Sequence, residues 1–286
     1  MQGLNLFGKI FIPLLAVMVV QNSCKPKKLV YKSPPHYNFA EVFPDKLDLP
    51  LKEISGVVWD HIKDEFIAQN DEMGKIFYLD KDTKITKSEF EFSKKKGDYE
   101  DITIANGIIY VLKSDGEVTK IITDSLGKQN ASEAGKINLS GSNDFEAMYY
   151  DPSRKALILI CKNCGSDDKK TVSAYAFYPD STGFDDKPVF TINAEKISQL
   201  SPRKTSKFQP SAAAIHPKLN QLFILSSASN QLVITDLNGE VESVFMLARK
   251  LFPQPEGITF KNSGDMYIAN EAVSSKSSLL KFTFKP

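Results

Sequence analysis

An internal repeat of about 46 residues is the feature that most limits how this 286-residue chain can fold. Five short segments resemble one another: Glu53-Ile-Ser-Gly-Val, Glu100-Asp-Ile-Thr-Ile, Glu146-Ala-Met-Tyr-Tyr, Ser211-Ala-Ala-Ala-Ile and Glu256-Gly-Ile-Thr-Phe. Their first residues lie 47, 46, 65 and 45 positions apart. A period near 45 residues is typical of a four-stranded propeller blade, whereas helical repeats have other periods and other apolar spacings. The repeat therefore predicts an all-β fold, a β-propeller.

Each repeat continues with the same succession of strands and turns. A short first strand leads through a turn rich in Pro, Asn or Asp to a second strand of β-branched and aromatic residues. We expect second strands at residues 65–68, 108–112, 156–160, 221–225 and 265–269. Third strands are expected at residues 75–79, 118–122, 172–177, 231–235 and 278–284. Fourth strands are expected only at residues 88–92, 136–139, 189–193 and 241–247.

The fifth repeat lacks a fourth strand, so we expect another segment to supply it. The unassigned segment from Tyr37 to Leu49 carries Phe39, Val42, Phe43 and Leu47 and precedes the first repeat. Pairing it with the last blade would close the ring and remove an exposed sheet edge. The strand count favours five blades. A six-bladed ring is the alternative if the insertion within residues 192–207 contains a further blade.

The N-terminus has the pattern of a bacterial lipoprotein signal peptide, which we assign to residues 1–23. Lys9 is followed by an apolar run over residues 10–20, which is shorter than the about 20 residues that a transmembrane helix needs. Small Ser23 directly precedes Cys24, whose thiol we expect to carry the lipid; cleavage nearby without lipidation is the alternative. Residues 24–36 would be the tether and residues 37–286 the propeller. The protein would then be anchored to a membrane of the bacterial cell envelope, on the periplasmic side or at the cell surface.

The charge balance argues against nucleic acid as a partner. Lys and Arg number 36 against 35 Asp and Glu, which gives a formal net charge of +1. No overall field attracts a polyanion. We expect a monomer that contacts the membrane only through its lipid.

Carboxylates should gather at one mouth of the central channel. The innermost strand of each blade lines that channel, so the first residues of the five repeats form a ring, and Glu53, Glu100, Glu146 and Glu256 are four of them. Crowded carboxylates raise one another's pKa unless a cation is present, and Ca²⁺ prefers about 6 to 8 oxygen ligands. Second strands run antiparallel to the first, so their ends return to this mouth. We predict a calcium site with these ligands: Glu53, Glu100, Asp101, Glu146, Glu256, Asn70 and Asn270. The alternative is that the glutamates only accept hydrogen bonds from blade loops.

At these residues the chain resembles the SdiA-regulated family, the YjiK-like proteins, which are distantly related to NHL-repeat propellers. The resemblance covers residues 37–286 and rests on four motifs: Glu53-Ile-Ser-Gly-Val-Val-Trp, Asp98-Tyr-Glu-Asp-Ile, Asn143-Asp-Phe-Glu-Ala-Met and Gln254-Pro-Glu-Gly-Ile. It implies a five-bladed propeller with bound calcium and no settled activity. Carried over to matching positions, it supports the four glutamates as site residues. Ser211 departs from the pattern because it brings no carboxylate.

Cys161 and Cys164 form the only cysteine pair after Cys24. An oxidising exported compartment favours a disulfide between them. A reduced structural pair and a redox or metal-binding role are the alternatives, although one such pair cannot supply a four-sulfur zinc site. His61 and His216 lie in turns that face away from the glutamates, so neither is a natural base there.

Two functions are compatible with these features. One is a noncatalytic envelope module that binds a protein, glycan or small ligand over the calcium-containing mouth. The other is a calcium-dependent hydrolase of a lactone or phosphate ester, because a bound cation can polarise such a substrate and activate water. The hydrolase needs a base beside the ion, for which the candidates are Asp71, Asp101, Asp115 and Glu271.

Overall fold

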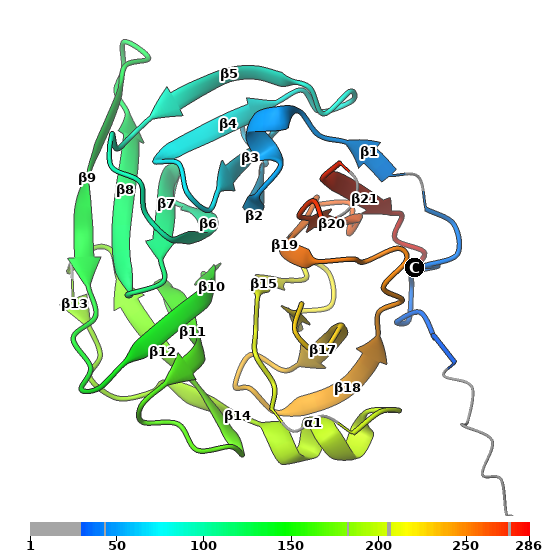
Figure 1. The fold of residues 1–286 in the computed structure, drawn as a ribbon. Coiled ribbons are helices and arrows are strands. Elements are labelled where there is room, and N and C mark those ends of the chain that lie inside the picture. The colour runs from blue at the N-terminus through cyan, green and yellow to red at the C-terminus, as the bar shows by residue number, and fades with distance from the viewer. Residues whose placement is uncertain (1–29, 43, 182, 205–206, 274–275) are drawn as a thin grey trace, which may run out of the picture.

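Five antiparallel β-sheets stand around a central axis in the computed structural model (Figure 1). The structure describes residues 30–286 except 43, 182, 205–206 and 274–275. The signal peptide and residues 24–29 of the tether, including Cys24, lie outside the described residues. Each sheet is one blade, so the expectation of an all-β, five-bladed propeller is confirmed. Within the described residues there is no helix that has both the length and the apolar composition to cross a membrane.

The strands follow the chain around the ring. Blade 1 consists of β2 (Ile54–Asp60), β3 (Glu65–Asn70), β4 (Lys75–Leu79) and β5 (Thr86–Glu91). Blade 2 consists of β6 (Tyr99–Ala105), β7 (Ile108–Lys113), β8 (Glu117–Thr123) and β9 (Gln129–Lys136). Blade 3 consists of β10 (Asn143–Asp151), β11 (Ala156–Cys164), β12 (Thr171–Tyr178), β13 (Gly183–Phe184) and β14 (Phe190–Asn193), the last two both paired with β12. Blade 4 consists of β15 (Ala212–Ile215), β16 (Leu222–Ser226), β17 (Gln231–Thr235) and β18 (Val241–Met246).

Blade 5 is completed from the N-terminal side of the chain, as expected. It contains β19 (Pro255–Phe260), β20 (Met266–Asn270), β21 (Ser278–Phe282) and the donated strand β1 (Pro44–Lys46). β1 lies antiparallel to β21, with Pro44 opposite Leu280 and Lys46 opposite Ser278. The donated strand is much shorter than the segment proposed for it. It ends before a short 3-10 helix, η1 (Leu49–Leu51), in which Pro50 takes a position that needs no backbone donor.

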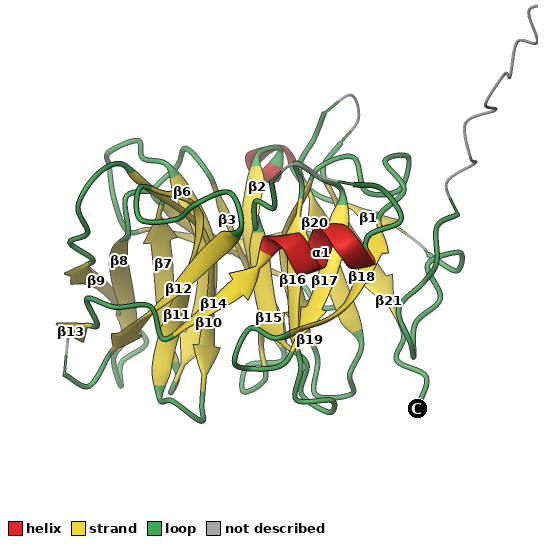
Figure 2. Cartoon of the chain, turned by 90° about the horizontal axis from the view of Figure 1, so that it is seen from below, coloured by secondary structure: helices red, strands yellow, loops and turns green. Residues whose placement is uncertain are grey.

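Two outer segments differ from the sequence-based expectation. β9 begins seven residues earlier than the expected strand at 136–139, because Ile137 packs into the core next to Phe145 while β9 itself is mostly polar and has no fully buried residue. The described residues of the insertion form no blade. It forms α1 (Ala194–Leu200), whose N-cap Asn193 accepts a hydrogen bond from the Lys196 backbone at 3.0 Å. Figure 2 shows α1 lying across the outer side of the ring.

The apolar core is divided among the gaps between neighbouring blades, as expected where sheets pack face to face. In the gap between blades 1 and 5, the Phe66 ring lies 4.6 Å from the Trp59 ring and 4.7 Å from the Tyr267 ring, measured between ring centres. All three side chains are buried. Ring closure is therefore sealed by aromatic packing as well as by strand pairing.

Tyr37 ties the segment before β1 to blades 4 and 5. The backbone N–H groups of Lys218 and Leu219 donate to Nδ1 of the fully buried His216, each at 3.1 Å. The ring proton must therefore be on Nε2, which donates to the Tyr37 hydroxyl at 2.7 Å. That hydroxyl donates in turn to the Gly264 carbonyl at 2.7 Å. The arrangement requires a neutral imidazole, and burial lowers the pKa of His216 to about 4.

Acidification should weaken the domain through His216. The unfolded imidazole takes up a proton near pH 6.5, the folded one only near pH 4, so this contribution is full above pH 6.5 and is lost as the pH falls through that window. We expect the free energy of unfolding of wild type, relative to that of His216→Gln, to decline by up to about 3 kcal/mol between pH 7 and pH 4. Urea unfolding of both proteins at each pH measures it. If the difference in free energy of unfolding between the two proteins did not change with pH, the folded protein would not hold His216 as a neutral imidazole.

Candidate cation-binding site at the channel mouth

Three glutamates reach one mouth of the central channel because each is the extra residue of a β-bulge. In blade 2, Tyr99 lies opposite Lys113 and Asp101 opposite Leu112, which leaves Glu100 without a partner across the sheet. Glu146 in β10 and Glu256 in β19 likewise have no partner on the neighbouring strand. A bulged residue departs from the strand's alternation, so its side chain is re-aimed. All three line one cavity of about 360 Å³.

The bulges correct the alignment of the first repeat. In blade 1 the bulged residue is Ser55, between Ile54 and Gly56, and Ser55 is 45 positions before Glu100. Glu53 lies two positions earlier and matches Asp98 of the second repeat. It also lines the cavity, but as a member of a second ring of side chains. The sequence comparison placed Glu53 in the wrong ring because it matched residue type rather than strand register.

Each blade thus contributes three positions to the mouth. The bulge ring consists of the bulged residues Ser55, Glu100, Glu146 and Glu256, with Ser211 at the corresponding position directly before β15. The outer ring, two residues earlier, consists of Glu53, Asp98, Asp144, Gln209 and Gln254. The third ring consists of Asp71, Ser114, Ser227 and Glu271, each directly after the second strand of its blade, and of Lys162, which lies within β11 near its end. Equivalent backbone bonds support this assignment, because Asp71 N–H donates to the Glu53 carbonyl at 3.0 Å and Glu271 N–H to the Gln254 carbonyl at 2.9 Å. Every member except Asp144 and Ser114 lines the cavity.

The carboxyl groups at this mouth cannot all be ionised unless a positive charge lies near them. Burial, with a further contribution from the Asp98 carboxylate, raises the pKa of Glu100 to about 8. Burial raises the pKa of Glu256 to about 7, although hydrogen bonds from Ser227 and Gln254 oppose it. The pKa values of Asp71, Asp144 and Glu271 are also raised, mainly by burial. A bound cation would relieve this penalty.

Lys162 is the one cation that the three rings contain. Its ammonium pairs with Glu146 and lies 3.9 Å from the Asp144 carboxylate. In blades 1 and 5 the equivalent positions are the acids Asp71 and Glu271. Sequence reasoning missed Lys162, although aligning the ends of the second strands would have shown a lysine in a column of acidic and hydroxyl residues.

Among the described residues, one group made only of oxygen donors converges closely enough to hold a metal ion. Glu100, Asp144 and Glu146 can each offer a carboxylate oxygen within 4.8 Å of the others. Across the mouth, Asp71 and Glu271 lie near Glu53 and Glu256, and Asp71 Oδ1 is buried and accepts no hydrogen bond from any described residue. An all-oxygen donor set with an unpartnered acceptor fits Ca²⁺ better than a metal that needs sulfur or imidazole.

Three of the predicted ligands lie in the framework instead. Asp101 is buried and accepts from the backbone N–H groups of Ile102 and Met148, each at 2.8 Å, so it links blades 2 and 3. Asn70 caps a turn by accepting from the Glu72 and Met73 backbones. The Asn270 amide donates to the Leu251 carbonyl at 3.4 Å. None of the three lines the cavity. Asp101 directly follows a bulge, so its side chain turns toward the neighbouring blade.

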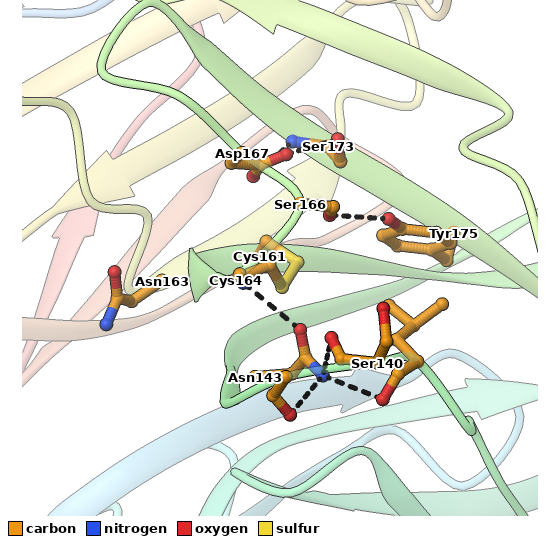
Figure 3. The surroundings of a disulfide bond; sticks show 12 residues. Ser140, Asn143, Cys161, Asn163, Cys164, Ser166, Asp167, Ser173 and Tyr175 are labelled. Carbon is orange, nitrogen blue, oxygen red and sulfur yellow. Dashed lines mark hydrogen bonds between the residues drawn. A yellow bond between two sulfur atoms is a disulfide. The ribbon is translucent and has the colours of Figure 1, made fainter.

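The remaining candidates divide between the mouth and its surroundings. Asp71 and Glu271 line the cavity, whereas Asp115 lies outside it and pairs with Lys136. Cys161 and Cys164 form a disulfide in the third blade, beside the mouth (Figure 3). His61 lines a separate, mainly apolar cavity formed by the opposite ends of the innermost strands.

Comparisons with known proteins agree with this architecture. Solved structures that share the fold include glutaminyl cyclase from Myxococcus xanthus, which is 11% identical and has a TM-score of 0.54 over 87% of this chain and 97% of that chain. A luciferin-regenerating enzyme is 11% identical, with a TM-score of 0.51 over 85% of this chain and 95% of its own. A protein of unknown function from Bacteroides thetaiotaomicron VPI-5482 is 10% identical, with a TM-score of 0.52 over 85% of this chain and 76% of that chain. At these identities the likeness shows the fold alone.

The search of curated proteins finds no match. The sequence profile of the family described as SdiA-regulated matches residues 46–273, a span that runs from the closing strand β1 past all three rings of the mouth. The chain therefore belongs to the SdiA-regulated family.

Proposed function

We propose that this protein is an exported binding module of the bacterial cell envelope that holds Ca²⁺ at the mouth of its propeller. The observation that carries the proposal is the approach of the Glu100, Asp144 and Glu146 carboxylates to within 4.8 Å of one another. The signal pattern of residues 1–23 and Cys24 supports export and lipid anchoring.

The three carboxylates would be the main ligands of the ion. Ca²⁺ takes about 6 to 8 oxygen donors, so water and neighbouring carboxylates such as Asp98 and Glu256 would complete the set. Bound Ca²⁺ would supply the positive charge that Glu100 and Glu256 need in order to ionise. The Lys162 ammonium competes for Glu146 and would have to give way.

The ligand-binding side of the mouth would be the neutral sector of blade 4. Gln209 and Ser227 line the cavity there and bring an amide and a hydroxyl group without charge, while the Ser211 hydroxyl already donates to the Pro255 carbonyl at 2.8 Å. Such groups can donate to and accept from a sugar hydroxyl or a peptide group. A protein, a glycan or a small polar molecule is therefore the class of partner that we propose, with Ca²⁺ fixing the opposite side of the site.

A second candidate function is calcium-dependent hydrolysis of a lactone or phosphate ester. The specific observation in its favour is Asp71, which lines the cavity with a raised pKa and an unpartnered buried oxygen. A carboxylate of this kind can take a proton from water. A bound Ca²⁺ would polarise the substrate.

Calcium should raise the melting temperature of the purified protein by several degrees, because binding at about 100 times the dissociation constant stabilises a fold by about 2.7 kcal/mol. The variant Glu100→Gln/Glu146→Gln should fold but lose this shift. Glu133→Gln, an exposed carboxylate outside the mouth, should keep it. Thermal unfolding with calcium or chelator measures the effect. A full shift in the double variant would exclude the proposed ligands.

Replacing Lys162 with Met should strengthen calcium binding by about tenfold, equivalent to about 1.4 kcal/mol, because it removes a competing cation. Lys250→Met is the matched control, since Lys250 is exposed and does not line the mouth. Isothermal titration calorimetry compares the affinities. Equal or weaker binding by the Lys162 variant would show that the ammonium does not compete.

Lactone and phosphate-ester substrates distinguish the two functions. If the protein is a hydrolase, turnover should require calcium and should fall by about 10² to 10⁴ in Asp71→Asn, while Asp115→Asn should retain it. Initial rates with calcium and with chelator are the measurement. Absence of calcium-dependent turnover across the panel would leave the binding module as the function.

A further inference from the structure

The disulfide of blade 3 encloses the residue that pairs with the acidic mouth. Cys161 lies opposite Phe145 and Asn163 opposite Asp144, so Lys162 is the residue of β11 left without a partner. The bond between Cys161 and Cys164, drawn in Figure 3, spans this irregular stretch. It therefore restrains the backbone that carries the Lys162 side chain. Geometry therefore links the state of the two sulfurs to the position of the ammonium.

A second cavity, of about 420 Å³, gives access to the disulfide from outside the mouth. Cys164 lines it, whereas Cys161 does not and is fully covered. Lys162 lines both cavities and so forms part of the wall between them. Lys169 and Lys207 also line the second cavity, together with Asp167 and Asp168. The cations favour the thiolate form of a cysteine, and the carboxylates oppose it.

We propose that Cys161–Cys164 is a redox site whose substrate is a dithiol, and that its state sets how firmly Lys162 is held against Glu146. The consequence for cation affinity rests on the proposed function; the redox site and the release of Lys162 do not.

The exchange balances with the dithiol as the only co-reactant. One thiolate of the dithiol attacks Cys164 Sγ, and the Cys161–Cys164 bond breaks. Its electron pair goes to Cys161, which takes up a proton. The second thiolate of the dithiol then attacks the dithiol's own first sulfur, which is bonded to Cys164 in the mixed disulfide. This releases the Cys164 thiolate, which takes up a proton. Two electrons and two protons enter the protein, and the reductant leaves as its own disulfide.

Reduction should weaken the pair between Lys162 and Glu146. Both side chains are only partly buried, with exposed fractions of 31% and 14%, so the pair depends on being held in register. Without the bond between the sulfurs, the bulge has more conformations and Lys162 spends less time at Glu146. The mouth then has a less effective internal cation and should bind an added cation more tightly.

Amine labelling tests the release of Lys162 without calcium. The protein is treated with dithiothreitol or left oxidised, labelled briefly with an acetylating ester and digested for mass spectrometry. Lys162 should acetylate severalfold faster after reduction, and exposed Lys250 should not change. A disulfide that resists dithiothreitol in the folded protein, or an unchanged Lys162 rate after reduction, would overturn the proposal.

Calcium titration tests the link to the mouth. Reduced wild type should bind calcium severalfold more tightly than oxidised wild type, and Lys162→Met should bind it equally in both states. If the labelling rate changes while calcium affinity does not, the link to cation affinity is wrong. If neither form binds calcium, the proposed function fails, and the labelling result still decides the redox site on its own.

Discussion

Three residues of β1, paired with β21, hold the two ends of the chain in one sheet, and the site depends on that pairing. Without it, blade 5 would have an open edge, and only the aromatic packing and a few hydrogen bonds between blades 1 and 5 would keep the ring closed. Closure brings Glu53 and Asp71 of the first blade beside Glu256 and Glu271 of the last. A crowded acidic mouth is thus a property of the closed ring, since neither blade has such a density of carboxyl groups alone.

Much of the fold was predictable because the repeat is long and regular. The period predicted the five blades. The missing fourth strand of the last repeat predicted that an N-terminal segment completes that blade. The outer strand β9 was misplaced because outer strands of a propeller face solvent and lack an apolar pattern. The helix α1 was not foreseen, since it is only seven residues long and its apolar positions, Ala194, Ile197 and Leu200, are too few to establish a period.

The site was predicted less well, and the reason is register. Residue type suggested that Glu53 matches Glu100, whereas the bulges match Ser55 to Glu100. A bulge adds one residue without changing local composition, so a comparison of residue types cannot see it. Asp101 was misassigned for a related reason, because one step along the strand turns its side chain from the channel to the next blade. Lys162 was missed because the site was predicted from acidic residues, and Lys162 is the one position of the third ring with a positive charge.

The hydrogen bonds of Tyr37 have a mechanical consequence. The Tyr37 hydroxyl joins His216 of the fourth blade and Gly264 of the fifth, and it comes before β1 in the chain. A pull on the N-terminus would therefore load this side chain before it loads the strand that closes the ring. Tension on the segment before β1 is thus transferred through Tyr37 to blades 4 and 5. The three paired residues of β1 bear this force only after the hydrogen bonds of Tyr37 have broken.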